Sequence, residues 1–331
     1  MDDRTTACLT SDCNWARPRS AAPALMALMI LVFLGLAPRL TWACACGCGV
    51  FEVGTGSMFA SHPGGMAFLE YDYLDQNQNW HGTSAAPAAD NDDKRLRTHF
   101  VTAGLQYTFN RQWGLIAQLP FAQRFFKTAG DDGEIDSFDH SALGDLRIEG
   151  VYTGLSEDMS TGITFGMKFP TGDYTYPNFD RDTEIGSGSF DFLVGAYHVG
   201  SFGLGPFAPG QELGWFAQIL WDRAFATQAG YRPGDELNTA LGIDYDLGPL
   251  GKITEFAPVL ELISSNRWRD SGSEADPENT GYDRLILTPG IEIGAGNVRI
   301  FADVGFPVFL NMNGDQIIAR ELYKLVVSYM F

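Results

Sequence analysis

The last eleven residues of the chain, Glu321 to Phe331, read E-L-Y-K-L-V-V-S-Y-M-F. Alternate residues of this stretch would fall on opposite faces of an extended strand. The apolar face would hold Tyr323, Leu325, Val327, Tyr329 and Phe331, and the polar face would hold Lys324 and Ser328. A soluble protein that ended in this way would expose an edge prone to pairing with other chains, whereas a closed transmembrane barrel pairs that edge with its first strand. The stretch therefore predicts an outer-membrane barrel, with the barrel-assembly machinery as a partner of the strand that ends in Phe331.

The amino-terminal part has the layout of a secretory signal peptide. Arg17 and Arg19 precede an apolar run from Ala21 to Ala37, and the small residues Ala43 and Ala45 follow this run. This order predicts cleavage after Ala43 or Ala45. The alternative is a retained membrane anchor, but the run falls short of the roughly 20 apolar residues that span a bilayer.

Three parts of the chain follow from this layout. We predict a signal peptide over residues 1–43 (or to 45), a periplasmic cysteine-containing segment over residues 44–65, and an outer-membrane β-barrel over residues 66–331. The mature protein is then expected in the bacterial outer membrane, surrounded by membrane lipid, with its amino terminus in the periplasm. The formal net charge of the chain is -19, so a nucleic acid is not an expected partner.

Stretches of about ten residues with alternating polarity recur from Met66 onward, between turn signals, as in outer-membrane barrels. They predict an all-β fold, a transmembrane antiparallel up-and-down β-barrel of about 12 strands. The strands are expected near residues 66–74, 98–109, 114–126, 142–153, 160–170, 188–199, 213–225, 237–247, 252–264, 282–293, 298–307 and 317–331. The links expected to be long and extracellular are 75–97, 127–141, 171–187, 226–236, 265–281 and 308–316.

The long links contain many of the acidic residues of the chain. Their carboxylates include Asp92, Asp93, Asp180, Asp182, Glu184, Asp270 and Asp276. The simplest interpretation is a solvated outer rim. Binding of a divalent cation is the alternative, although no run matches the spacing of a calcium loop.

Charged residues of both signs fall on the strand faces opposite to the apolar ones. A charge that faced lipid would cost about 2 to 4 kcal/mol at the membrane midplane, so these residues are expected inside the barrel. The residues predicted to line the lumen are Arg147, Glu149, Lys168, Asp191, Glu261, Arg284, Glu292, Arg299 and Asp303. Two outcomes remain open, a narrow polar pore or an interior closed by ion pairs.

Two short elements resemble a known family. Lys168 to Asp173 reads K-F-P-T-G-D, and Gly186 to Gly195 reads G-S-G-S-F-D-F-L-V-G. They are similar to the K-x-P-T-G-D and G-x-G-S-x-D-x-x-x-G elements of the outer-membrane family called "MetA-pathway of phenol degradation". The resemblance implies a channel or transporter, for aromatic or other hydrophobic small molecules among its cargo. Physically, Pro170 and Gly172 would end one strand, and Gly186 and Gly188 would allow the sharp entry into the next.

The cysteine segment contains Cys44, Cys46 and Cys48 at alternate positions. In an extended chain these residues share one face, and Gly47 and Gly49 would let the thiolates converge on one ion. Sulfur ligands without a nearby histidine favour Cu(I), with zinc as the second choice. A disulfide formed in the oxidising periplasm, or a lipidated Cys44, are the alternatives.

We expect no catalytic residues and no enzyme, because no serine lies beside a histidine at the spacing of a nucleophile elbow. The pair Asp139 and His140 is interpreted as a solvated rim pair. The sequence therefore favours a barrel channel or transporter for small molecules, aromatic or hydrophobic compounds included. The alternative is a non-conducting barrel scaffold whose amino-terminal cysteines bind copper.

Overall fold

This computed structural model describes residues 43–44, 58–59, 62–130, 133–204 and 212–331, the first pair by backbone alone. Almost all of them that lie in regular structure are in antiparallel strands, apart from the short 3-10 helix η3 (Ala88–Asp90). No helix within these ranges is long and apolar enough to cross a membrane.

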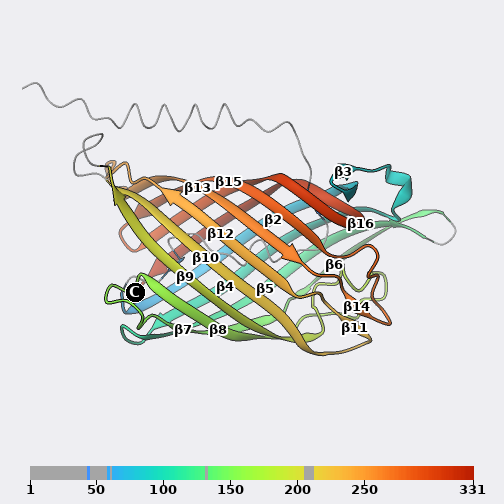
Figure 1. The fold of residues 1–331 in the computed structure, drawn as a ribbon, viewed down its shortest axis with the longest axis horizontal. Helices are drawn as coiled ribbons and strands as arrows, with labels where there is room; N and C mark the ends of the chain where they lie inside the picture. The colour runs from blue at the N-terminus through green and yellow to red at the C-terminus, as the bar shows by residue number, and fades with distance from the viewer. Residues whose placement is uncertain (1–42, 45–57, 60–61, 131–132, 205–211) are drawn as a thin grey trace, which may run out of the picture. The chain divides into compact units, whose positions relative to one another are not determined.

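A closed ring of paired strands forms the body of the structure (Figure 1). Its strands are β2 (Gly64–Gly82), β4 (Asp93–Thr108), β5 (Trp113–Ala129), β7 (Leu146–Tyr152), β8 (Thr161–Phe169), β9 (Ser189–Gly203), β10 (Glu212–Thr227), β12 (Glu236–Asp244), β13 (Glu255–Arg267), β15 (Tyr282–Ala295) and β16 (Val298–Met330). The strands outside the ring are β1 (Ala43–Cys44), β3 (Ser84–Ala85), β6 (Ile135–Leu143), β11 (Tyr231–Arg232) and β14 (Ser271–Gly272). Each ring strand pairs antiparallel with its neighbours, and β16 pairs back with β2, so the predicted up-and-down barrel is confirmed.

The last strand, β16, contains a tight hairpin. Residues 298–312 pair with β15, and residues 315–330 pair with β2. Gly314 at the turn has a φ of 70°, a conformation that glycine adopts without strain. At the far end of the hairpin the Met330 N–H donates to the Asn297 carbonyl at 2.9 Å. Because β16 contributes two arms, the eleven ring strands supply twelve antiparallel segments of the barrel wall. This number agrees with the prediction of about 12 strands.

Several predicted boundaries were wrong at the end of the barrel that carries the Gly314 turn. β2 continues to Gly82 and β4 begins at Asp93, so most of the link expected at 75–97 is strand. β5 and β6 together occupy most of the expected link 127–141, and the strand expected at 142–153 is interrupted between β6 and β7. Polar residues occupy both faces of these extensions, and this removes the alternation by which strands are found.

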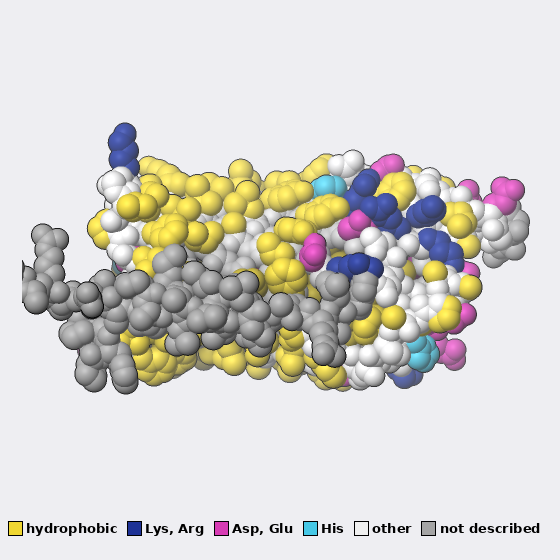
Figure 2. All heavy atoms as spheres, turned by 90° about the horizontal axis from the view of Figure 1, so that it is seen from above, with side chains coloured by type: hydrophobic (Ala, Val, Ile, Leu, Met, Phe, Trp, Pro, Cys, Tyr) yellow, Lys and Arg dark blue, Asp and Glu magenta, His cyan; other side chains and the backbone are white. Residues whose placement is uncertain are grey.

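The outer surface of the barrel is apolar along the strands. Outward side chains of the carboxyl-terminal arm, such as Tyr323 and Tyr329, are 39% and 52% exposed, whereas inward Lys324 and Ser328 are each 6% exposed. Figure 2 shows hydrophobic side chains over the strands and charged side chains gathered towards one end. Such a belt matches a surface that contacts lipid.

The interior is more apolar than the sequence predicted. Inward-facing Leu193, Phe216, Leu220, Ile263 and Ile286 are each at most 3% exposed and pack in one cluster. Apolar side chains therefore occupy part of the interior between the charged groups. The interior is therefore neither an open polar pore nor closed by ion pairs alone.

Candidate functional site in the barrel interior

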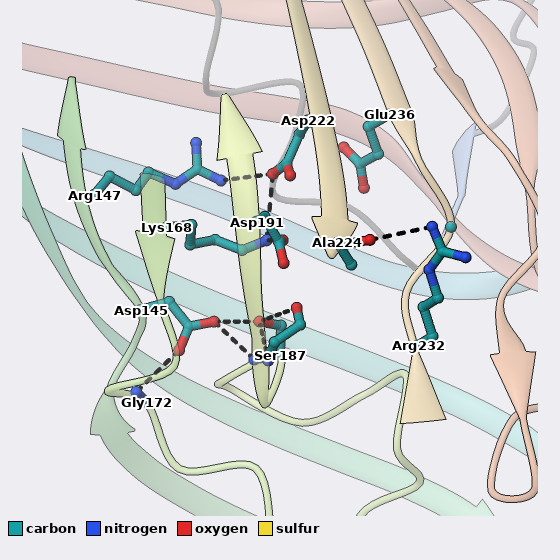
Figure 3. A network of polar contacts seen from close by, with 12 residues as sticks. Asp145, Arg147, Lys168, Gly172, Ser187, Asp191, Asp222, Ala224, Arg232 and Glu236 are labelled. Carbon is teal, nitrogen blue, oxygen red and sulfur yellow. Dashed lines mark hydrogen bonds and ion pairs between the residues drawn. The ribbon is translucent and has the colours of Figure 1, made fainter. Parts of the chain in front are cut away.

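One ion-paired group lies across four consecutive ring strands, β7 to β10, and we call it the Lys168 cluster. It comprises Arg147, Lys168, Asp191 and Asp222 (Figure 3). Lys168 Nζ lies 3.2 Å from Asp222 Oδ2 and contacts the Asp191 carboxylate, while Arg147 Nη2 lies 3.7 Å from Asp222 Oδ2. These side chains are at most 14% exposed, so the two cations and two carboxylates neutralise one another away from bulk water.

A second group surrounds Lys324 on the opposite wall. The ammonium interacts with the carboxylates of Glu70, Asp72, Glu261 and Asp303. Asp72 is the register partner of Lys324 across β2 and β16. Four carboxylates around one ammonium make this part of the interior acidic when all are ionised.

The remaining predicted lumen residues form smaller contacts. Arg299 Nη1 lies 2.7 Å from Glu292 Oε1 and 3.0 Å from Glu255 Oε2. Arg284 is 2% exposed, and its Nη2 lies 3.1 Å from Tyr282 Oη. Glu149 is 8% exposed. The nine predicted residues are thus spread over several groups and are not gathered at a single centre.

The segment 170–188 lies partly inside the barrel, although the sequence predicted a solvated outer rim. Glu184 and Ile185 line an interior cavity, whereas Asp180 is exposed. Asp145 anchors it, accepting hydrogen bonds from Gly172 N (3.0 Å), Ser187 N (2.8 Å) and Ser187 Oγ (2.6 Å) (Figure 3). Arg124 donates to the Glu184 carbonyl at 2.7 Å. We call this segment the inward loop.

Glycines allow the inward loop to pack tightly. A Cβ atom on Gly186 would lie 2.5 Å from the Gly172 carbonyl carbon, and a Cβ on Gly172 would lie 2.9 Å from the Gly144 carbonyl carbon. Both distances are shorter than real Cβ atoms tolerate. Glycines of the two sequence elements that resemble the phenol-degradation family therefore let three backbone segments, at residues 144, 172 and 186, come into close contact.

Acidic side chains of the inward loop line a cavity of about 520 Å³ at the same end of the barrel. Its walls include Asp92, Asp93, Asp180, Asp182 and Asp276, and we call it the acidic mouth. Burial raises the pKa of Asp180, and the negative charge of Asp182 adds to the increase. Carboxylates that the sequence assigned to a solvated rim therefore line one cavity formed by several links.

Two acidic residues predicted to be solvated are buried. Glu184 is 6% exposed, and burial together with the negative charge of Asp173 raises its pKa to about 7. Asp270 is 1% exposed and accepts hydrogen bonds from Tyr231 Oη (2.5 Å) and Gly234 N (2.7 Å). Both carboxylates lie in links that fold back on the barrel, which polarity alone could not predict.

Below the inward loop lies a cavity of about 180 Å³ that we call the central cavity. Apolar side chains from Phe100, Ala122 and Ile185 form part of its wall, and Lys168 and Asp222 form another part. This mixture suits a small molecule with an apolar body and a polar group.

The cysteine prediction concerns residues that are mostly outside the described ranges. Cys46 and Cys48 are not described, and Cys44 is described by its backbone, which pairs with Ile318 through β1. Among the described side chains, no group of three or more His, Cys, Asp or Glu could hold a metal ion. The predicted signal peptide and most of the segment 44–65 also lie outside these ranges.

His140 contacts other groups than its sequence neighbour Asp139. Its Nε2 lies 3.0 Å from Asp173 Oδ2, and its ring stacks on Tyr176 with centroids 4.0 Å apart. The histidine therefore helps to hold the inward loop.

Comparison with known proteins bears on the fold. No family model matches the sequence, and a search of curated proteins finds no match. The structure is similar to the crystal structure of an outer membrane channel from Pseudomonas putida F1, with 15% sequence identity and a TM-score of 0.61 over 85% of this chain and 100% of that chain. The transport unit of the autotransporter AIDA-I from Escherichia coli aligns with 11% identity and a TM-score of 0.46, over 95% of this chain and 100% of that chain. The likeness to the Pseudomonas putida channel shows that the chain has the fold of an outer-membrane β-barrel.

Proposed function

We propose that this protein is an outer-membrane channel or transporter for small molecules, aromatic or hydrophobic compounds among them. The observation that carries the proposal is the line of inward charged groups and cavities inside an apolar-faced barrel. Charged groups at membrane depth are expensive and mark pathways for ions or substrates more often than they stabilise a scaffold. The likeness of two sequence elements to the phenol-degradation family supports the choice of cargo.

The proposed path begins at the acidic mouth, continues to the central cavity and passes the Lys168 cluster. Carboxylates at a narrow opening attract cations and repel anions, so an ionic current through this path would prefer cations. The nine predicted lumen residues would lie along or beside this path.

In this structure the inward loop stands across the proposed path. Its anchors are hydrogen bonds to Asp145, Arg124 and His140, not strand pairing. Phe179 and Ile185 add packing against buried apolar side chains. Loops held in this way can move while the barrel wall stays intact. The inward loop is thus the proposed gate.

The orientation follows from the ends of the barrel. Gly65 and Phe331 lie together, and we assign that end to the periplasm, with the inward loop at the cell exterior. The strand that ends in Phe331 would be the one that the barrel-assembly machinery engages. This assignment agrees with short turns on the periplasmic side of such barrels.

Current through planar lipid bilayers tests the proposal. Purified full-length protein is expected to give discrete conductance steps that disappear when the protein is omitted. Silence at all voltages, from the wild type and from a variant whose inward loop is released by Asp145→Ala, would favour the alternative, a non-conducting barrel scaffold. The apolar cluster around Phe216 and Leu220 is the observation that supports this alternative.

We also propose that the cysteine segment binds Cu(I) through Cys44, Cys46 and Cys48. The support is the thiolate spacing alone. A peptide spanning residues 44–53 should retain Cu(I) against a competing chelator, and its Cys46→Ser variant should release the metal. Equal release by both peptides would contradict the assignment.

A further inference from the structure

Phe59 lies inside the barrel although it precedes the first barrel strand. Its ring stacks on Tyr197, with centroids 4.3 Å apart and planes inclined by 19°, and lies 5.7 Å from the Phe216 ring. Tyr197 in β9 and Phe216 in β10 are inward-facing residues that are 5% and 2% exposed. Met58 packs beside it against the cluster that contains Phe68. A side chain that belongs to none of the ring strands thus occupies a site in the barrel interior beside Tyr197 and Phe216, which we call the aromatic slot.

The wall provides room for this slot through two glycines. Gly162 is the register partner of Tyr197, and a Cβ atom there would overlap the tyrosine ring. A Cβ atom on Gly242 would overlap the ring of Phe216 in the same way. Larger residues at either position would push the rings towards Phe59 and close the slot.

The slot also contains a polar group without a partner. The Tyr197 hydroxyl is buried and has no hydrogen-bond partner within the described part of the chain. A cavity of about 70 Å³ adjoins it, lined in part by Phe59, Gln106, Gln118 and Gln218. Buried hydroxyl groups are normally hydrogen-bonded, so this one is poised for a polar atom that the described residues do not supply.

We propose that Phe59 occupies a binding subsite for an aromatic ring that carries a hydroxyl group, and that such a molecule displaces Phe59 to stack on Tyr197 and bond to its hydroxyl. Phe59 is suited to leave because no strand pairing holds it. The proposal deepens the proposed transport of aromatic compounds and rests on it for its biological role, but not for the binding itself.

Binding of 2-naphthol to the purified full-length protein in detergent, followed by titration calorimetry, tests the subsite. Phe59→Ala removes the side chain that competes with the ligand. Binding should tighten about ten-fold relative to wild type, because the ligand no longer has to displace the Phe59 ring. Phe202→Ala is the matched control, since this β9 aromatic is outward-facing and 58% exposed. It should bind as wild type does.

A second variant separates stacking from hydrogen bonding. In the Phe59→Ala background, Tyr197→Phe should weaken 2-naphthol binding about five-fold, as expected for one lost hydrogen bond, and leave naphthalene binding unchanged. Heat-dependent migration in gels shows that each variant is folded. Equal affinity of wild type and Phe59→Ala, or equal tightening by Phe202→Ala, would overturn the proposal. Conductance without this binding would refute the subsite alone, and binding without conductance would refute the channel alone.

Discussion

Gly65 and Phe331 exchange two backbone hydrogen bonds, each 2.8 Å long, so the last residue of the chain pairs with the start of the first strand. This contact completes the ring at one end of the barrel. The Phe331 ring lies where a Cβ atom of residue 65 would be, so any larger residue at position 65 would have to displace the ring. The absence of a side chain at Gly65 therefore lets the Phe331 ring pack over the closing strand pair.

Gly65→Ala should lower the free energy of unfolding by about 1 to 3 kcal/mol, as expected for overpacking. Tryptophan fluorescence during urea unfolding in detergent measures the change. Gly203→Ala is the control, because a Cβ atom there would meet nothing within 4 Å. Identical urea midpoints for the two variants would show that the Phe331 ring can move at no cost.

Asp145→Ala should release the inward loop, because three hydrogen-bond donors lose their acceptor. Each such bond is worth about 0.5 to 1.5 kcal/mol, so trypsin cleavage after Arg181 should accelerate at least about ten-fold. Mass spectrometry of the released peptides measures the rate. Asp136→Ala, which removes an exposed carboxylate from β6, should cleave as wild type does. Equal rates for all three proteins would mean that Asp145 does not hold the loop.

Lys168→Met should destabilise the barrel by about 3 to 5 kcal/mol, because Asp191 keeps a buried charge without its ammonium partner. Adding Asp191→Asn to this variant should recover part of the loss. Lys252→Met, at an exposed position, serves as the control for a lost positive charge. If the single variant unfolded at the wild-type urea concentration, the Lys168 cluster would contribute nothing to stability.

The inward loop should become more tightly closed as the pH falls. Burial and the negative charge of Asp173 raise the pKa of Glu184, Arg181 and Arg124 oppose the increase, and the resulting pKa is about 7. The closed loop therefore binds a proton more tightly than an open, solvated loop. Its extra stability is fully present below the ordinary glutamate pKa and is lost as the pH rises through about 7.

Trypsin cleavage after Arg181, measured between about pH 6 and pH 8 and corrected for the activity of the protease, checks this dependence. Cleavage of the wild type should increase with pH with a midpoint near 7. Glu184→Gln should cleave slowly across the range. If Glu184→Gln showed the same dependence of the cleavage rate on pH as the wild type, a group other than Glu184 would cause it.

The barrel could be predicted from the sequence because polarity alternates along each strand, so that apolar side chains face lipid and polar side chains face the interior. Tyr323 and Lys324 illustrate this, one being 39% and the other 6% exposed. The same rule predicts inward positions for Lys168 and Asp191, whose side chains are 13% and 2% exposed. It could not identify Asp222 as the second partner of Lys168, because contacts across strands that are not neighbours in sequence depend on register and tilt.

The gate and the aromatic slot could not be predicted in this way. The inward loop has no periodicity, and its charges at Asp180 and Glu184 indicated solvent. Its path into the barrel depends on the close contact of Gly172 and Gly186. Phe59 precedes the first strand, so no register assigns it to the interior. Local alternation of polarity predicts the strands of the barrel wall. The positions of the loop and the side chains inside the barrel depend on contacts between residues that are distant in the sequence.

The most direct test of the account is the single-channel current of the purified protein across a planar bilayer with a KCl gradient. The wild type should give small or infrequent steps, and Asp145→Ala should give larger or more frequent steps whose reversal potential indicates preference for K⁺. Neutralising the acidic mouth with Asp180→Asn and Asp182→Asn should reduce that preference. Silence from both wild type and Asp145→Ala, with both proteins folded, would contradict the account.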